Sequence, residues 1–103
     1  MAMNSIDTLQ DLREAVKSPR CCVIFTKRGC LHCTVVKNAA ESLSVAFPSV
    51  TFLCTENTEL AKVEHVSAYP TMCFYEKGTE FATLIGSGHL LGLRKMLEYW
   101  TQE

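Results

Sequence analysis

The chain is 103 residues long, 48% hydrophobic, and carries a formal net charge of −1 at pH 7. This length suits one domain with a single core, so we assign residues 1–103 to one unit. A near-neutral charge does not favour binding to nucleic acid or to an anionic membrane surface. The N-terminus lacks the apolar core of a signal peptide, and no apolar run approaches the ~20 residues of a membrane span. We therefore expect a cytoplasmic, monomeric protein with no nucleic-acid or membrane partner.

The N-terminal segment predicts a strand, a helix and a second strand. A short strand over residues 2–4 comes first, and then a helix capped by Asn4 or Ser5. The apolar side of this helix repeats with helical period, at Ile6, Leu9, Leu12 and Val16. Ser18-Pro19 ends the helix, because the residue before a proline disfavours helical backbone. The run 21–26 predicts a strand buried on both faces, as in a parallel sheet.

The middle of the chain predicts two further helices around a strand. The helix that starts near Cys30 is stopped by Pro48. Its apolar stripe consists of Val36, Ala40, Leu43 and Phe47. Residues 50–54 predict a second buried strand, and Asn57 or Thr58 caps a short helix after it. The inward residues of that helix are Leu60, Val63 and Val66.

The C-terminal third predicts a hairpin and a last helix. A third strand begins at Tyr69 and continues to Tyr75, and a fourth covers residues 81–85. The turn over 76–79 contains a glycine suited to positive φ. The core face of the final helix consists of Leu90, Leu93, Leu97 and Trp100. This order predicts an α/β fold with a mixed sheet of four to five strands and helices on both faces.

The six cysteines divide into one close pair and four scattered residues. Cys30 and Cys33 form a C-x-x-C motif at the carboxyl end of a predicted strand, where open α/β sheets place their sites. The scattered residues, which we expect to be small buried core residues, are Cys21, Cys22, Cys54 and Cys73. None of them forms the second C-x-x-C that a zinc ribbon needs. In a reducing compartment this pattern favours free thiols with one working pair, without a metal or cofactor.

The motif predicts dithiol–disulfide exchange. Residues three apart at a helix start face the same way, and the helix N-terminus favours an anion. Cys30 is therefore expected to have a lowered pKa and to be the attacking thiolate. Lys27, Arg28 and a protonated His32 add positive charge that favours the same thiolate. Cys33, which lies one turn behind, then attacks Cys30 in the mixed disulfide and releases the reduced substrate.

In combination, three features of this chain resemble the thioredoxin-like family, and the resemblance covers essentially the whole sequence. They are Cys30-Leu31-His32-Cys33 after a buried strand, Tyr69-Pro70-Thr71 at the start of a later strand, and Ile85-Gly86 before the final helix. The resemblance implies the thioredoxin fold, a redox-active Cys30–Cys33 disulfide, and protein-disulfide oxidoreductase activity in electron transport and cell redox homeostasis. It also implies that Pro70 is cis and lies against the disulfide.

The resemblance further implies where substrate and partners bind. An extended substrate segment pairs with the backbone at Tyr69, beside the thiols. The expected substrate-binding residues are Gly29, Leu31, Tyr69, Pro70, Thr71, Gly86 and Ser87. The implied partners are disulfide-containing proteins, together with a thioredoxin reductase or glutathione as electron donor.

The chain departs from the thioredoxin pattern next to the motif. Gly29 stands where Trp is usual, Leu31-His32 replaces the usual Gly-Pro, and Ile24 replaces a buried acid that is thought to assist proton removal from the second cysteine. The base for Cys33 is therefore unassigned among His32, water and Glu56. A histidine between the cysteines stabilises the reduced form, which predicts a higher reduction potential than that of an ordinary thioredoxin.

Other hypotheses stay open at this point. Phe25-Thr26-Lys27 ahead of Cys30, and the turn 86–88, resemble glutaredoxins, whose lysine contacts the glutathione carboxylate. The Pro70-Thr71 pair and the long segment before it are thioredoxin-like, so the chain leans to thioredoxin. The remaining alternatives are a module that holds a metal or an iron–sulfur cluster between two chains, and a docking domain with little turnover.

Overall fold

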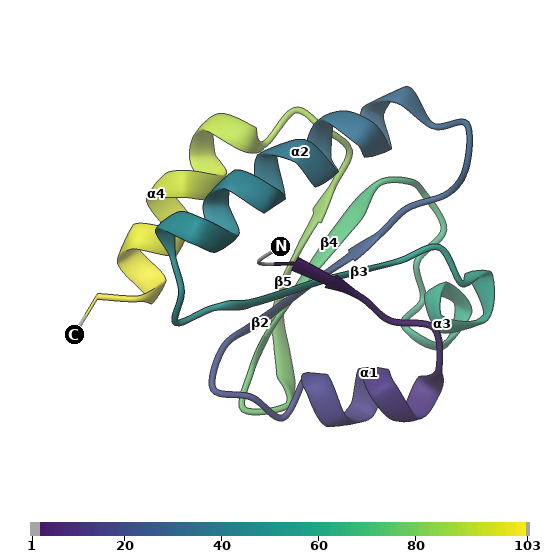
Figure 1. The fold of residues 1–103 in the computed structure, drawn as a ribbon, viewed down its shortest axis with the longest axis horizontal. Helices are drawn as coiled ribbons and strands as arrows, with labels where there is room; N and C mark the ends of the chain where they lie inside the picture. The colour runs from purple at the N-terminus through teal and green to yellow at the C-terminus, as the bar shows by residue number, and fades with distance from the viewer. Residues whose placement is uncertain (1–2, 103) are drawn as a thin grey trace.

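A five-stranded sheet in the order β1-β3-β2-β4-β5 forms the centre of the molecule (Figure 1). The structure is a computed structural model that describes residues 3–102. The strands are β1 (Met3–Ser5), β2 (Cys21–Phe25), β3 (Thr51–Thr55), β4 (Thr71–Glu76) and β5 (Thr79–Ile85). β3 pairs in parallel with β1 and β2, whereas β4 runs antiparallel to both β2 and β5. The predicted mixed sheet is therefore confirmed.

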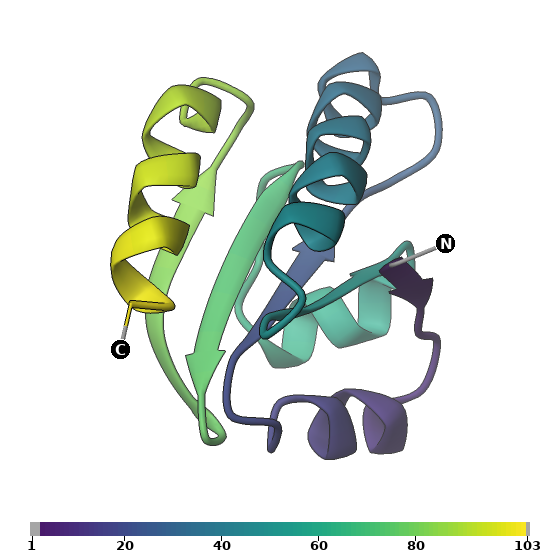
Figure 2. The same ribbon diagram turned by 60° about the vertical axis from the view of Figure 1, so that its left-hand side comes forward.

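Two helices cover each face of this sheet. The helices are α1 (Leu9–Ala15), α2 (Leu31–Ala46), α3 (Thr58–Val63) and α4 (Leu90–Trp100). Figure 2 shows α2 and α4 on one side of the strands and α1 and α3 on the other. Within the described residues, no helix is both long enough and apolar enough to cross a membrane.

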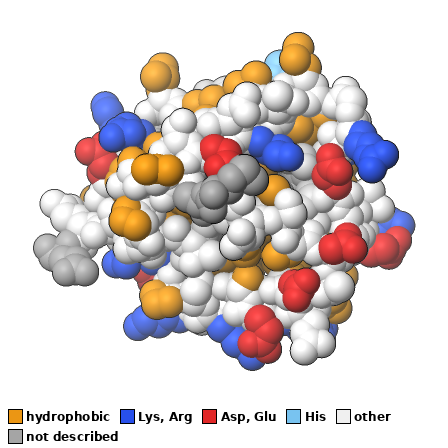
Figure 3. Space-filling view, in the orientation of Figure 1, with side chains coloured by type: hydrophobic (Ala, Val, Ile, Leu, Met, Phe, Trp, Pro, Cys, Tyr) orange, Lys and Arg blue, Asp and Glu red, His pale blue; other side chains and the backbone are white. Residues whose placement is uncertain are grey.

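Side chains alternate between two hydrophobic cores along β2. Cys22 and Ile24 belong to the core under α2 and α4, while Val23 and Phe25 belong to the core over α1 and α3. Every residue of β2 is fully buried, as a strand covered on both faces requires. On the face seen in Figure 3, acidic and basic side chains are interspersed, which fits the small net charge.

The first helix begins later than predicted. Ser5 pairs with Cys54 in the sheet, so its backbone is part of a strand and neither Asn4 nor Ser5 caps a helix. Thr8 is the N-cap instead, and its Oγ1 accepts a hydrogen bond of 3.1 Å from the Asp11 backbone N–H. The short strand expected over 2–4 is found at Met3–Ser5, and Ala2 lies outside the described residues.

The prediction that Val63 faces inward is wrong. Its side chain is 47% exposed, whereas Leu60 and Ala61 are 2% exposed and pack on the sheet. The helix has only six residues, so one buried turn suffices to anchor it. Asn57 caps it, as predicted, by accepting a hydrogen bond from the Glu59 backbone N–H.

The hairpin between β4 and β5 turns over residues 76–79, as predicted, with Gly78 at positive φ, but β5 begins earlier than predicted. Lys77 and Gly78 both have positive φ, which is the geometry of a two-residue type I′ turn. β5 therefore begins at Thr79 rather than Phe81. A register shift in the hairpin pairs Phe74 with Ala82 and Tyr75 with Glu80, which leaves Phe81 unpaired between them. The ring of Phe81 packs 4.9 Å from that of Trp100 on α4.

β4 also begins later than predicted, at Thr71 rather than at Tyr69. Pro70 has no backbone N–H to donate to a neighbouring strand, so the ladder starts one residue after it. Thr71 pairs with Phe25, the last residue of β2. The segment before β4 consequently lies at the same edge of the sheet as the loop after β2.

Candidate functional site

Cys30 and Cys33 form a disulfide where the loop after β2 enters α2, with their Cα atoms 5.2 Å apart. Cys30 is the N-cap of this helix, and its Sγ accepts a hydrogen bond of 3.1 Å from the Cys33 backbone N–H. Cys33 is 2% exposed, whereas Cys30 is only partly buried. Gly29, the residue before this N-cap, has φ of +71°, a left-handed conformation that glycine adopts without strain. The helix start therefore presents the first sulfur and covers the second.

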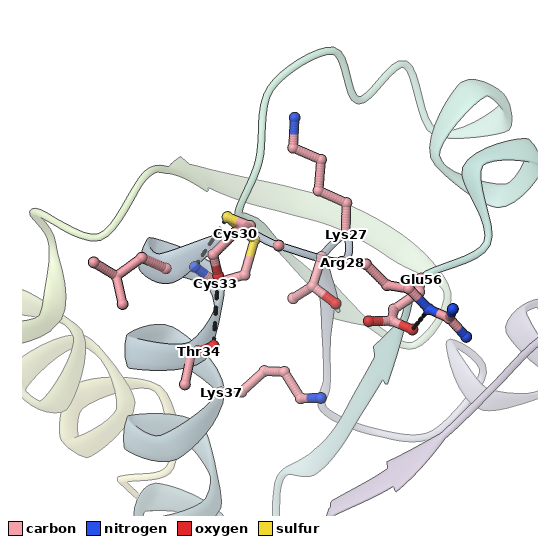
Figure 4. Close-up of a pocket in the computed structure, with 10 residues that line it drawn as sticks. Lys27, Arg28, Cys30, Cys33, Thr34, Lys37 and Glu56 are labelled. Atoms are coloured by element: carbon pink, nitrogen blue, oxygen red, sulfur yellow. Dashed lines mark hydrogen bonds and ion pairs between the residues drawn. A yellow bond between two sulfur atoms is a disulfide. The ribbon is translucent and has the colours of Figure 1, made fainter.

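The two cations of the approach loop point to different partners. Lys27 Nζ lies 5.5 Å from the centre of the Tyr69 ring. Arg28 is 94% exposed, and its Nε lies 3.9 Å from Oε1 of Glu56. Figure 4 shows the Arg28 side chain directed to Glu56, away from the disulfide. Of the two, only Lys27 is linked to a residue expected to bind substrate.

Three segments that are distant in the sequence meet beside the disulfide. His32 Nδ1 lies 2.9 Å from Ser87 Oγ, which links the first turn of α2 to the turn before α4. The Gly86 backbone N–H donates a hydrogen bond of 2.8 Å to the Pro70 carbonyl, and Gly86 has φ of +87°. The fold thus brings the motif, the Pro70 segment and the Gly86-Ser87 turn together.

The Tyr69–Pro70 peptide bond is cis, as the family resemblance implied. Pro70 is fully buried, while Tyr69 is half-buried and Leu31 is 76% exposed. Thr71 is also buried, and its Oγ1 donates a hydrogen bond of 2.7 Å to the Ala68 carbonyl. That Pro70 lies against the disulfide stays a prediction.

A pocket of about 500 Å³ opens beside the disulfide (Figure 4). Its lining includes both motif cysteines and Thr26, which directly follows β2. Two charged residues outside the predicted site also line it, Lys37 and Glu56, and Glu56 is one of the three candidate bases for Cys33. Lys37 lies four residues after Cys33, a spacing that places both on one face of a helix. That spacing is the sequence signal that could have revealed Lys37. The pocket is therefore a charged one, although Ile24 contributes no acid.

The other four cysteines are buried, as predicted. Burial raises the pKa of Cys21 and of Cys73 to about 12, and the Glu80 carboxylate acts in the same direction on Cys73. Burial also raises the pKa of Cys22 well above its usual value. These thiols stay protonated at neutral pH, so they are poor nucleophiles. In residues 3–102, no group of three or more His, Cys, Asp or Glu side chains is arranged to hold a metal ion.

Together, the mixed five-stranded sheet, the C-x-x-C disulfide at a helix start and the cis-proline before the adjoining strand define the class of thioredoxin-fold proteins. The thioredoxin family model matches residues 5–99, so the chain belongs to the thioredoxin family.

Individual relatives agree with this assignment. A thioredoxin from Geodia cydonium is 28% identical in an alignment that covers 93% of this chain and 96% of that protein. A thioredoxin of Fasciola hepatica has 26% identity and a TM-score of 0.76, with 88% of this chain and 89% of that chain covered. A mutant thioredoxin from Halobacterium salinarum superposes with a TM-score of 0.89 at 17% identity, covering 98% of this chain and 92% of that one, and at that identity supports the fold alone.

Family membership and the bonded cysteine pair support thiol–disulfide oxidoreductase chemistry in general. The classes of partner that follow are disulfide substrates and reductases in general.

Proposed function

We propose that this protein reduces disulfide bonds in other proteins, using the Cys30/Cys33 dithiol as its two-electron carrier. The observation that carries this proposal is the unequal placement of the two sulfurs. Cys30 is partly exposed at the N-cap of α2 and accepts a backbone hydrogen bond, whereas Cys33 is buried one turn behind. An accessible sulfur at a helix N-terminus is stabilised as a thiolate, which is the nucleophilic form.

The exchange proceeds in two steps. The Cys30 thiolate attacks one sulfur of the substrate disulfide, and the other substrate sulfur leaves with the bonding electron pair and takes up a proton. Cys33 then loses its proton and attacks Cys30, so that the Cys30–substrate bond breaks and the second substrate thiol is released. The substrate gains two electrons and two protons, and the protein is left as the Cys30–Cys33 disulfide.

The surroundings suit a substrate polypeptide. We assign substrate contacts to Gly29 and the 76% exposed Leu31 on one side of Cys30. On the other side the contacts come from Tyr69, Pro70, Thr71, Gly86 and Ser87, which the His32–Ser87 and Gly86–Pro70 hydrogen bonds hold near the motif. Lys27, and His32 when it is protonated, add positive charge that favours the Cys30 thiolate, and Arg28, which is directed to Glu56, contributes less. A thioredoxin reductase supplies the electrons in the cytoplasm, and the protein acts as a monomer.

An insulin-reduction assay tests the assignment. Cys30→Ser should abolish turnover and Cys33→Ser should stall the protein as a mixed disulfide that mass spectrometry detects. Cys54→Ala, at a buried cysteine outside the motif, is the matched control and should stay active. Full activity of the Cys30→Ser variant would refute the proposal.

A glutathione-dependent reaction is the second candidate, because Lys27 lines the pocket beside Cys30 and offers a cation to a carboxylate. Activity that depends on glutathione, fails with thioredoxin reductase, and is lost in Lys27→Ala would favour it. Activity with the reductase that survives Lys27→Ala would exclude it.

A further inference from the structure

We infer that Lys37 and Glu56 together remove the proton from Cys33, with Lys37 positioned to stabilise the thiolate and Glu56 to accept the proton. This inference rests on the proposed function, since it concerns the second step of that reaction. It assigns a task to two charged residues that the fold places beside the buried sulfur.

The need for such a pair follows from the burial of Cys33. Only 2% of this residue is exposed, and burial without a compensating charge disfavours a thiolate. The strand beneath offers no carboxylate, because Ile24 is apolar, fully buried and paired with Met72 and Cys54. His32 is turned to Ser87 at the rim of the site. The proton of Cys33 must therefore leave through the pocket that it lines.

Lys37 and Glu56 are two of the four charged residues that line this pocket, and the other two are Lys27 and Arg28. Lys37 is half-buried and lies one helical turn after Cys33 on the same face of α2. Glu56 follows β3, and its side chain is 50% exposed. Figure 4 shows Lys37 extending from α2 below the disulfide, toward the side of the pocket that holds Glu56. A second cavity of about 260 Å³ is also lined by both residues.

The other charged groups around Cys33 are placed less well for this task. Lys27 lies against the Tyr69 ring, and Asp7 lines the second cavity but not the first. The Arg28 Nε lies 3.9 Å from the Glu56 carboxylate, and the Arg28 side chain is 94% exposed, so solvent weakens this ion pair. Of these groups, Lys37 alone is a cation on the same helix face as Cys33.

The proposed step moves one proton from Cys33 and one electron pair to the substrate sulfur. The Cys33 thiol gives its proton to the Glu56 carboxylate through the open pocket, while the Lys37 ammonium stabilises the sulfur anion. The thiolate attacks Cys30, and the Cys30–substrate bond breaks with its electron pair on the substrate sulfur. That sulfur then takes a proton, which restores the ionised form of Glu56 through solvent.

A two-phase reaction with 5,5′-dithiobis(2-nitrobenzoate) separates the two cysteines. Attack by Cys30 releases the first coloured thiolate at a rate proportional to reagent concentration. Attack by Cys33 releases the second at a rate independent of it. Loss of the first phase in the unmodified protein would contradict the proposed function, whereas the inference concerns the second phase alone.

The variants Lys37→Met and Glu56→Gln should each slow the second phase about tenfold at neutral pH, and the midpoint of its pH profile should rise by about one unit in Lys37→Met. Lys37→Arg should restore the rate, because it restores the charge. Lys95→Met on α4 and Glu59→Gln on α3, both exposed, are the charge-matched controls and should leave both phases unchanged. A second phase that is unaltered in either pocket variant, or an equal slowing of both phases, would overturn the inference.

Discussion

Replacing Cys30 by alanine or by serine separates its structural role from its chemical one. In the native helix the Cys30 sulfur accepts a hydrogen bond from the Cys33 backbone N–H, the third residue of α2. Serine is a preferred N-cap and can accept the same bond, whereas alanine cannot. Both variants lack the nucleophile, so neither should reduce insulin. Only the alanine variant should also lose the cap.

The expected difference in the free energy of unfolding is about 1 kcal/mol, the typical cost of replacing an N-cap by alanine. With an unfolding entropy of about 2.1 cal/mol/K per residue, a chain of 103 residues should melt about 5 °C lower as Cys30→Ala than as Cys30→Ser. Thermal unfolding followed by circular dichroism, in excess reductant, measures this difference without a contribution from the disulfide.

A matched pair at Cys22, which caps no helix, is the control. There serine should not be more stable than alanine, because a hydroxyl replaces a small apolar group at a fully buried site. If Cys30→Ala and Cys30→Ser melt within about a degree of each other, the sulfur does not cap α2. The helix start would then have no demonstrated contact that stabilises the Cys30 thiolate.

Three further predictions concern the cores and the turn beside the site. The pKa of Cys21 and of Cys73 is raised by burial from an ordinary 9.0 to about 12, so above pH 9 the unfolded chain releases protons that the folded protein keeps. The free energy of unfolding should therefore fall as pH rises from 9 toward 12, by up to about 1.4 kcal/mol per pH unit for each thiol. Urea unfolding at a series of pH values should show a smaller fall when Cys21 and Cys73 are both replaced by alanine. Leu97→Ala, at a fully buried position on α4, should cost about 2–5 kcal/mol in the same assay, and a cost below about 1 kcal/mol would contradict the assigned core. Gly86→Ala should lower the free energy of unfolding by about 1–2 kcal/mol, because Gly86 has φ of +87°. The Gly86 N–H donates to the Pro70 carbonyl, so the variant should also raise the KM for insulin. An unchanged KM and an unchanged stability would argue against this turn as part of the site.

Local patterns in the sequence determined much of the fold. The continuous apolar run of β2, the helical stripe of α2 and the start of that helix at Cys30 depend on residues close together in the chain. Period and capping act over one or two turns, so they can be predicted without knowing the tertiary structure. The same holds for the C-x-x-C pair, whose sulfurs are brought together by one turn of a helix.

Other features depended on pairings that local patterns do not contain. Asn4 and Ser5 are preferred helix caps by residue type, yet both lie in β1 because this strand pairs with β3 along its whole length. Arg28 stands next to the motif in sequence, but its side chain points to Glu56 after β3, away from the disulfide.

The composition of the site was decided by the tertiary structure. His32 and Ser87 are 55 residues apart and meet because β5 returns beside the start of α2. Lys37 and Glu56 line one pocket because the carboxyl ends of β2 and β3 lie side by side under the first turns of α2. Sequence chemistry thus identified the reacting sulfurs, whose geometry is local, while the charges around the buried sulfur were set by strand order and register.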